Sequence, residues 1–309
     1  MERPLAAGAA SARFLIEPLS SIRMKADVTD ALAGDLPSDL PTGLVPPAGT
    51  PAVTFTSGGH ALLGVLHLPA GPGPHPIVVL LHGFPGNERN FDLAQALRRA
   101  GYAALVFHYR GSWGVGGSYS WGNVLEDAAR VTRAVREDAV AAAHRLDPGR
   151  LALVGHSLGG FAALMTAAAD PAVRAVVSVA AFDLGKAAAA CRADPGARAA
   201  YTSAWDGELL PLRDTSGAAL VAEMEAAGEA WSLAGLAPRL ADRPVLLIGT
   251  GRDSVTPAET HHHPLVEAYR AHPVPGLEHR LYPTDHALSD HRLTLARAVT
   301  GFLDRRLAD

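Results

Sequence analysis

The chain of 309 residues has a single cysteine, Cys191, so no disulfide can form within it. This composition fits a reducing compartment. No run of about 18 apolar residues occurs, which argues against a transmembrane helix. The first 20 residues also lack the sustained apolar stretch of a secretory signal. We therefore expect a cytoplasmic protein.

Long blocks of one charge are absent as well. The 27 Lys and Arg residues are balanced by 31 Asp and Glu residues, which leaves a net charge of −4. A surface without an extended basic patch gives no reason to expect nucleic acid or an anionic membrane as a partner. Hydrophobic residues make up 48% of the chain, which is enough to bury a substantial core.

The first 50 residues differ in composition from residues 51–309. The stretch "DLPSDLPTGLVPPAGTP" is rich in proline, glycine and aspartate, which is typical of an extended segment rather than a core element. Two interpretations stay open for this Pro/Gly-rich N-terminal extension: a tail without fixed structure, or an arm packed on the body or on a partner subunit. The second would allow a homodimer held by the arm.

From residue 51 onward, apolar runs of strand length alternate with helical patterns. Strands are expected at 61–68, 77–82, 103–109, 151–156, 174–182 and 243–251, and in "HRLYP". Helices are expected in "NFDLAQALRRAGY", in "VLEDAARVTRAVREDAVAAAHRL" up to the "DPG" at 147–149, in "LGGFAALMTAAA" and in "RLTLARAVTGFLDRRL". This alternation predicts an α/β fold with a mostly parallel central sheet covered by helices on both faces. About 55 residues without strands follow Asp183, and we interpret about 184–240 as a helical insertion.

The stretch "GHSLGG" (155–160) has the pattern G-x-S-x-G directly between a predicted strand and a predicted helix. Glycines 155 and 159 permit a crowded turn, which would raise Ser157 above the sheet. The following N–H groups lie at a helix N-terminus and favour developing negative charge. A serine that merely caps the helix is the simpler alternative.

A nucleophilic serine needs a base, and the base needs an acid that orients it. His286 in "PTDHALSD" precedes the last helix, and Asp253 in "GTGRDSV" follows a strand end. The order Ser157, Asp253, His286 is that of the α/β-hydrolase triad. Asp285 is the competing acid but directly precedes the histidine, and His291 is the competing base but falls at the start of a helix.

With these motifs in order, residues 51–309 resemble the α/β-hydrolase superfamily, most closely its prolyl-oligopeptidase-like and dienelactone-hydrolase-like esterases and peptidases. The resemblance implies that "HGFPG" (82–86) helps form an oxyanion hole, with the backbone N–H groups of Phe84 and Leu158 as donors. It also implies that "HYRGSWGVGGS" corresponds to a loop in which His108 stands where an Asp is common. Arg110 in this loop is expected to be structural.

Several aromatic residues are candidates for substrate binding. Three lie in the glycine-rich loop, Trp113, Tyr119 and Trp121, and two in the insertion, Trp205 and Trp231. We expect the insertion to form a cap over the site. The histidines of "ETHHHP" (259–264) suggest a metal site, but consecutive side chains cannot converge on one ion. No metal or other cofactor is expected.

The function predicted from these residues is a serine hydrolase that cleaves carboxylic esters of small to medium acyl substrates through an acyl-enzyme. Two alternatives stay open. The same triad could serve a peptidase, amidase, thioesterase or acyltransferase, or the fold could carry a non-catalytic binding protein.

Overall fold

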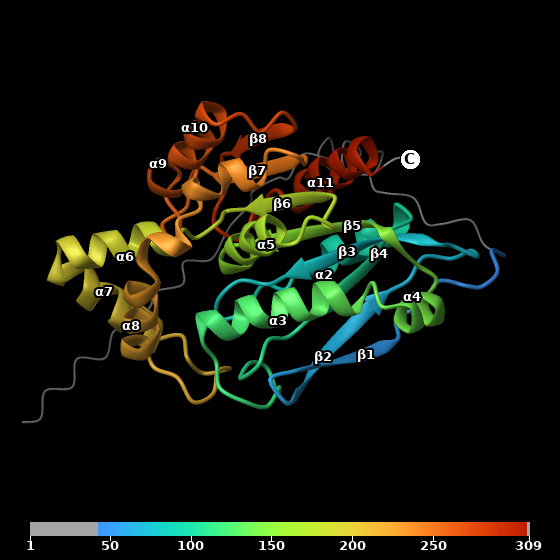
Figure 1. Cartoon of the computed structure of the whole chain (residues 1–309), viewed down its shortest axis with the longest axis horizontal. Helices are drawn as coiled ribbons and strands as arrows, with labels where there is room; N and C mark the ends of the chain where they lie inside the picture. Colours follow the sequence, from blue (N-terminus) through green and yellow to red (C-terminus); the bar gives the residue numbers. More distant parts are fainter. Residues whose placement is uncertain (1–42, 308–309) are drawn as a thin grey trace, which may run out of the picture. The chain divides into compact units, whose positions relative to one another are not determined.

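The computed structural model describes residues 43–307, and within them eight strands form one sheet (Figure 1). Its order is β1-β2-β4-β3-β5-β6-β7-β8. The strands are β1 Ala52–Ser57, β2 His60–His67, β3 His75–Leu81, β4 Ala103–Phe107, β5 Leu146–His156, β6 Ala175–Val179, β7 Val245–Thr250 and β8 Leu277–Tyr282. β2 pairs with β1 and β4 in antiparallel fashion, and every other neighbouring pair is parallel. The prediction of a mostly parallel α/β sheet is confirmed.

Helices cover both faces of this sheet. The helices are α2 Phe91–Arg99, α3 Trp121–Ala134, α4 Asp138–His144, α5 Leu158–Ala169, α6 Leu184–Ala193, α7 Pro195–Asp206, α8 Gly217–Ala227, α9 Ala258–His261, α10 His263–Ala271 and α11 Arg292–Arg306, with 3-10 turns η1 Gly228–Trp231 and η2 Ala234–Arg239. The apolar side chains of α2 and α11 pack in one core, and those of α3 and α5 in another.

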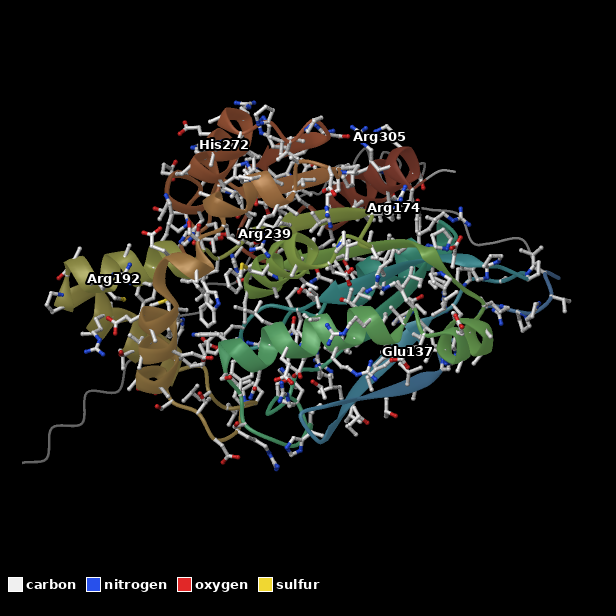
Figure 2. The ribbon with its side chains drawn as sticks, in the orientation of Figure 1. Glu137, Arg174, Arg192, Arg239, His272 and Arg305 are labelled. Carbon is white, nitrogen blue, oxygen red and sulfur yellow. The ribbon has the colours of Figure 1, made fainter. Side chains whose placement is uncertain are left out.

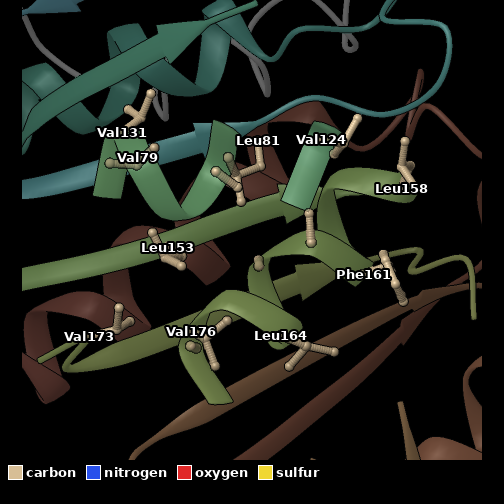
Figure 3. Close-up of a cluster of buried hydrophobic side chains, with 14 of the residues drawn as sticks. Val79, Leu81, Val124, Val131, Leu153, Leu158, Phe161, Leu164, Val173 and Val176 are labelled. Carbon is tan, nitrogen blue, oxygen red and sulfur yellow. The ribbon is translucent and has the colours of Figure 1, made fainter. Parts of the chain in front are cut away.

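Alternation along the strands explains the two cores. Successive strand residues point to opposite faces, so Val79 and Leu81 of β3 face α3 and α5, whereas Val78 and Leu80 face α2 and α11. Figure 3 shows the core on the side of α3 and α5, where Phe161 and its neighbours on α5 lie against the sheet. The continuous apolar runs of the sequence are therefore strands buried on both sides.

The insertion, residues 184–240, is helical as expected, and it consists of several short helices. α6 ends at Ala193 and α7 begins at Pro195. Asp194 between them is extended, and its carboxylate accepts a hydrogen bond from Gly196 N. An Asp cap followed by proline in the first turn begins a new helix. Figure 1 shows α6, α7 and α8 grouped at one end of the sheet.

Two expectations about other elements need correction, and one strand was not expected. The helix predicted up to residue 146 is two helices, because Glu137 is extended between α3 and α4. The "DPG" at 147–149 lies within β5, at a shift in its register with β3. β1 was not expected from the sequence, because it lies at the edge of the sheet and its burial pattern is mixed.

Many charged side chains lie on the outside of the layers. Figure 2 labels Glu137, Arg174 and Arg305 among them, and all three are exposed. Among residues 43–307, no helix is both long and apolar enough to span a membrane. Most of the N-terminal extension, and with it the predicted arm and homodimer, lies outside the described residues.

Candidate active site

Ser157 occupies a strained turn between β5 and α5. β5 ends at His156 and α5 begins at Leu158, so a single residue makes the connection. Its backbone has φ 58° and ψ −121°, a conformation that residues other than glycine rarely adopt. A Cβ on Gly155 would lie 1.9 Å from the Gly159 carbonyl oxygen, so this turn requires glycine. The polar side chain of Ser157 therefore lies at a point where the chain is held tightly.

The "HGFPG" loop passes beside this turn. A Cβ on Gly83 would lie 2.9 Å from the Ser157 Cβ, so the loop approaches the serine as closely as its backbone allows. Leu158 is the first residue of α5, and its N–H has no acceptor within the helix. The turn and loop hydrogen bonds of the described residues use neither this N–H nor that of Phe84. Both amides belong to the segments that adjoin Ser157.

Asp253 and His286 form a hydrogen-bonded pair on the loops after β7 and β8. His286 Nδ1 lies 2.7 Å from Asp253 Oδ2. The hydroxyls of Thr250 and Thr256 each donate to Asp253 Oδ2 at 2.6 Å, and the N–H groups of Val255 and Thr256 donate to Oδ1. Burial alone would raise the pKa of Asp253, but the hydrogen bonds from His286 and the two threonines hold that pKa well below its usual range.

The competing acid and base have other partners. Asp285 accepts hydrogen bonds from the N–H and hydroxyl of Ser289, which helps shape the loop that carries His286. His291 Nδ1 lies 2.8 Å from Asp290 Oδ1. The structure therefore pairs the histidine ring of His286 with Asp253, the carboxylate that chain order had favoured.

His156 lies beneath His286. Its Nε2 is 2.7 Å from the His286 carbonyl oxygen, and the two ring centroids are 4.8 Å apart. Burial lowers the pKa of His156 to about 3, so the ring is neutral at neutral pH and its Nε2–H donates to the carbonyl. The motif around Ser157 gave no sign of this contact between His156 and the loop of His286.

Ser157, His156 and His286 line one cavity of about 490 Å³. Aromatic rings form one wall: Phe182 follows β6, and Tyr201 and Trp205 belong to α7, their rings 5.4 Å apart. The remaining lining residues are Gly83, Phe84, Pro85, Gly86, Asn87, Glu88, Ala204, Glu208, Ser254, Val255 and Ala287. The insertion thus contributes a wall of the cavity that contains the serine.

The aromatic residues chosen from the sequence lie in different places. Trp205 lines the cavity of Ser157, and Trp113 lines a neighbouring cavity. Tyr119 and Trp121 are buried behind Phe84, with the Trp121 ring 5.3 Å from that of Phe84. Trp231 packs on Phe161 of α5 at 5.9 Å. None of these last three residues lines either cavity.

Sequence reasoning missed Tyr201, Phe182, Thr250 and Thr256. Phe182 and Thr250 carried a usable signal, because each lies at or just beyond a parallel strand end, where sites form in such sheets. Tyr201 carried none, because its place depends on how the insertion folds.

Two further sequence motifs have structural contacts. Arg110 donates to Asp127 and Glu126, at 2.7 Å and 2.6 Å, as the structural interpretation expected. His261 Nδ1 accepts a hydrogen bond from Asp183 N at 3.1 Å, and the ring of His262 lies under Gly249.

Curated relatives match part of the chain. Hydrolase LUC6 from Fusarium sp. is 39% identical over 134 residues, which are 39% of this chain and 30% of that protein. The 2,6-dihydropseudooxynicotine hydrolase of Paenarthrobacter nicotinovorans is 30% identical over 114 residues, 37% of this chain and 30% of that protein. The matched segment thus spans less than a third of either relative's length.

Solved structures match the fold over a larger share of the chain. Est1E from Butyrivibrio proteoclasticus, in a structure with ferulic acid bound, superposes with a TM-score of 0.65 at 18% identity and covers 84% of this chain and all of that one. The Pyrococcus furiosus esterase Pf2001 gives a TM-score of 0.61 at 17% identity, covering 84% of this chain and 92% of that one. The model of the alpha/beta hydrolase family matches residues 78–298, well over half of the chain. The chain therefore belongs to the alpha/beta hydrolase family.

Proposed function

We propose that this protein is a serine hydrolase that cleaves carboxylic esters of small to medium substrates through an acyl-enzyme. Ser157 is the nucleophile, His286 the general base and Asp253 the acid that orients it. One observation carries the proposal: His286, whose Nδ1 lies 2.7 Å from Asp253 Oδ2, lines the same cavity as Ser157 on its strained turn. Activation of a serine needs these three groups in reach of one another.

The hydrogen bond between His286 and Asp253 supports the following proton path. Because Asp253 is ionised, His286 Nδ1–H donates to it, and Nε2 is left free to accept the Ser157 proton. Ser157 Oγ attacks the ester carbonyl, and the imidazolium that forms is stabilised by Asp253. His286 then gives the proton to the departing alcohol. Water attacks the acyl-serine by the same route in reverse and releases the acid.

Negative charge on the carbonyl oxygen needs donors during both steps. The N–H groups of Leu158 and Phe84 are the proposed pair, since they lie in the two segments that adjoin Ser157. The N-terminal end of α5 adds a favourable dipole at the same point. Each such donor is worth about 3 kcal/mol in the transition state.

Ester rather than amide substrates are supported by the structural relatives. The Pyrococcus furiosus protein is named an esterase, and Est1E was solved with ferulic acid bound. The cavity of this chain also has an aromatic wall, made by Phe182, Tyr201 and Trp205. An uncharged acyl group with an aromatic or aliphatic chain fits such a wall.

The test is labelling and turnover in matched variants. Wild-type protein should react with a fluorophosphonate at Ser157 and hydrolyse p-nitrophenyl acetate, and Ser157→Ala should lose both, with residual turnover roughly 10³-fold or more below wild type. Ser203→Ala, on the exposed side of α7, is the control and should retain both. A Ser157→Ala protein that keeps wild-type turnover would place the nucleophile elsewhere. Rapid cleavage of aminoacyl anilides with slow cleavage of esters would instead favour the peptidase alternative.

A further inference from the structure

A second cavity, of about 620 Å³, adjoins the cavity of Ser157. Pro85, Asn87 and Glu208 line both, so these residues form the boundary between the two spaces. Trp113 and Leu210 are among the residues that line the second cavity alone. A substrate group that passes Pro85 and Asn87 would leave the first cavity and enter the second.

Two loops are joined to build this second cavity. One is the part of the insertion at 207–213, and the other is the glycine-rich loop at 111–119. Trp113 N donates to the Pro211 carbonyl at 3.0 Å, and Arg213 N donates to the Gly111 carbonyl at 2.8 Å. Backbone hydrogen bonds in both directions hold the walls at a set spacing, so the cavity is a built feature of the fold.

Trp113 is held in a strained conformation at the wall. Its φ of 47° lies in the left-handed region, which a bulky side chain rarely occupies. Its indole Nε1–H donates to the Pro85 carbonyl at 2.9 Å, and the Arg89 guanidinium lies 4.3 Å from the ring centroid. Gly86 makes room for the ring, because a Cβ there would lie 2.6 Å from Nε1. Such strain persists where the surroundings enforce it, and it gathers at ligand sites.

The second cavity has an unusually exposed apolar rim. Leu210 is 100% exposed, and it neighbours Pro211 and Leu212, which also line the cavity. With the indole of Trp113, these side chains offer an apolar surface for a ring or a branched chain. Glu208 at the boundary and Arg213 at the wall carry opposite charges, so the cavity as a whole favours an uncharged group.

We propose that the second cavity is a substrate subsite, with Trp113 as its specificity-determining residue. It accepts an uncharged, ring-bearing or branched apolar substituent distant from the reacting carbonyl, and this substituent reaches it across Pro85 and Asn87. The subsite rests on the proposed function, because the carbonyl of the same substrate must lie at Ser157.

The test compares two ways of removing the indole. Trp113→Ala and Trp113→Gly both lose the ring, but glycine accepts the left-handed backbone, so the glycine variant should melt at a higher temperature than the alanine variant. The substrates are acetate esters with short or long aryl-bearing alcohols, and methyl esters with short or long aryl-bearing acyl chains. In both variants kcat/KM should fall roughly tenfold or more for the long member of at least one series. The short members do not reach the second cavity and should lose much less, so that the ratio of kcat/KM for long and short substrates falls.

Leu281→Ala is the control, because it removes a large, exposed apolar side chain from β8, where it lines neither cavity. It should leave the ratio of long to short substrates unchanged. If both Trp113 variants also keep the wild-type ratio, or lose long and short substrates equally, the subsite is wrong while the proposed function stands. If the wild-type protein neither hydrolyses the short esters nor labels at Ser157, both proposals fail together.

Discussion

The backbone conformation of Ser157 lowers the stability of the folded state. This conformation is unfavourable by about 1–3 kcal/mol for a residue with a side chain. The flanking contacts enforce it, because Ser157 alone connects β5 and α5 and Gly159 lies against the Leu81 carbonyl. A serine that only capped a helix would accept a hydrogen bond from the first turn, and Ser157 makes no such side-chain bond.

The acid can be tested by a pair of aspartate variants. Asp253→Asn should lower kcat by on the order of 10³-fold to 10⁴-fold, because the amide can donate to His286 Nδ1 and so favours the wrong tautomer. Asp285→Asn should lower kcat far less, since its partners are the N–H and hydroxyl of Ser289. The measurement is kcat on p-nitrophenyl acetate beside the melting temperature. The opposite ranking of the two variants would show that Asp253 is not the acid.

His156 offers a test of how the proposed base, His286, is positioned. Its Nε2–H donates to the His286 carbonyl and so holds the loop that carries His286. His156→Gln keeps a neutral donor at a similar reach, whereas His156→Leu removes it. We expect the leucine variant to lose roughly tenfold in kcat, with KM unchanged, because a small displacement of a catalytic group is costly. The glutamine variant should recover most of this loss.

If the leucine and glutamine variants instead show the same changes in KM and in melting temperature, His156 has only a packing role. The donor itself was out of reach of the sequence, since the acceptor lies 130 positions further along the chain.

At the scale of elements, the sequence identified the strands well because most of them are buried on both faces. Continuous apolar runs such as the one in β3 have few alternatives once flanked by turn signals. The sequence did not indicate where a helix ends when that end depends on tertiary contacts. α3 ends at Ala134, and the Arg136 side chain beyond it pairs with Asp170 at the end of α5. No pattern near Arg136 reveals that distant partner.

In the loops after the strand ends, some residues of the candidate site could be predicted from the sequence and others could not. Ser157, Asp253 and His286 could be chosen because each follows a predicted strand in a recognisable order. The aromatic residues could not be sorted, since Trp121 and Trp205 look alike in sequence. In the structure Trp121 Nε1 donates to the Leu220 carbonyl and its ring is buried, whereas Trp205 reaches the cavity.

The insertion therefore gives two tryptophans with different expected effects. Trp205→Leu removes part of the cavity wall and should change the ratio of kcat/KM for short and long acyl esters by about tenfold. Trp231→Leu removes a ring packed on Phe161 and should mainly lower stability, by about 1–3 kcal/mol. Substrate panels and melting curves on both variants measure this. Equal changes in the ratio would mean that α7 has no special part in selecting substrates.

For the whole molecule, the buried histidines set the response to acid. Burial, as the largest cause, lowers the pKa of His82 and His156 to about 3 and that of His261 and His262 to about 4. In the unfolded chain these groups have their ordinary value of about 6.5, so between the two values the unfolded state binds more protons. Their contribution to stability is complete above about pH 6.5 and is lost as the pH falls toward 3–4.

One variant isolates this effect without touching Ser157. His262 is buried, and its Nε2 has no hydrogen-bond partner among the described residues. At pH 5.5 a group of this kind costs about 1.4 kcal/mol of unfolding free energy relative to neutral pH. Urea unfolding at pH 7.5 and at pH 5.5 measures how much unfolding free energy is lost on acidification. Because the glutamine of His262→Gln cannot take up a proton, this variant should lose less unfolding free energy than wild type, by about that amount. His272→Gln, at an exposed position, should lose as much as wild type. If His262→Gln and wild type lose equal stability between pH 7.5 and pH 5.5, His262 takes up its proton in the folded protein as readily as in the unfolded chain. The acid sensitivity then has its origin elsewhere.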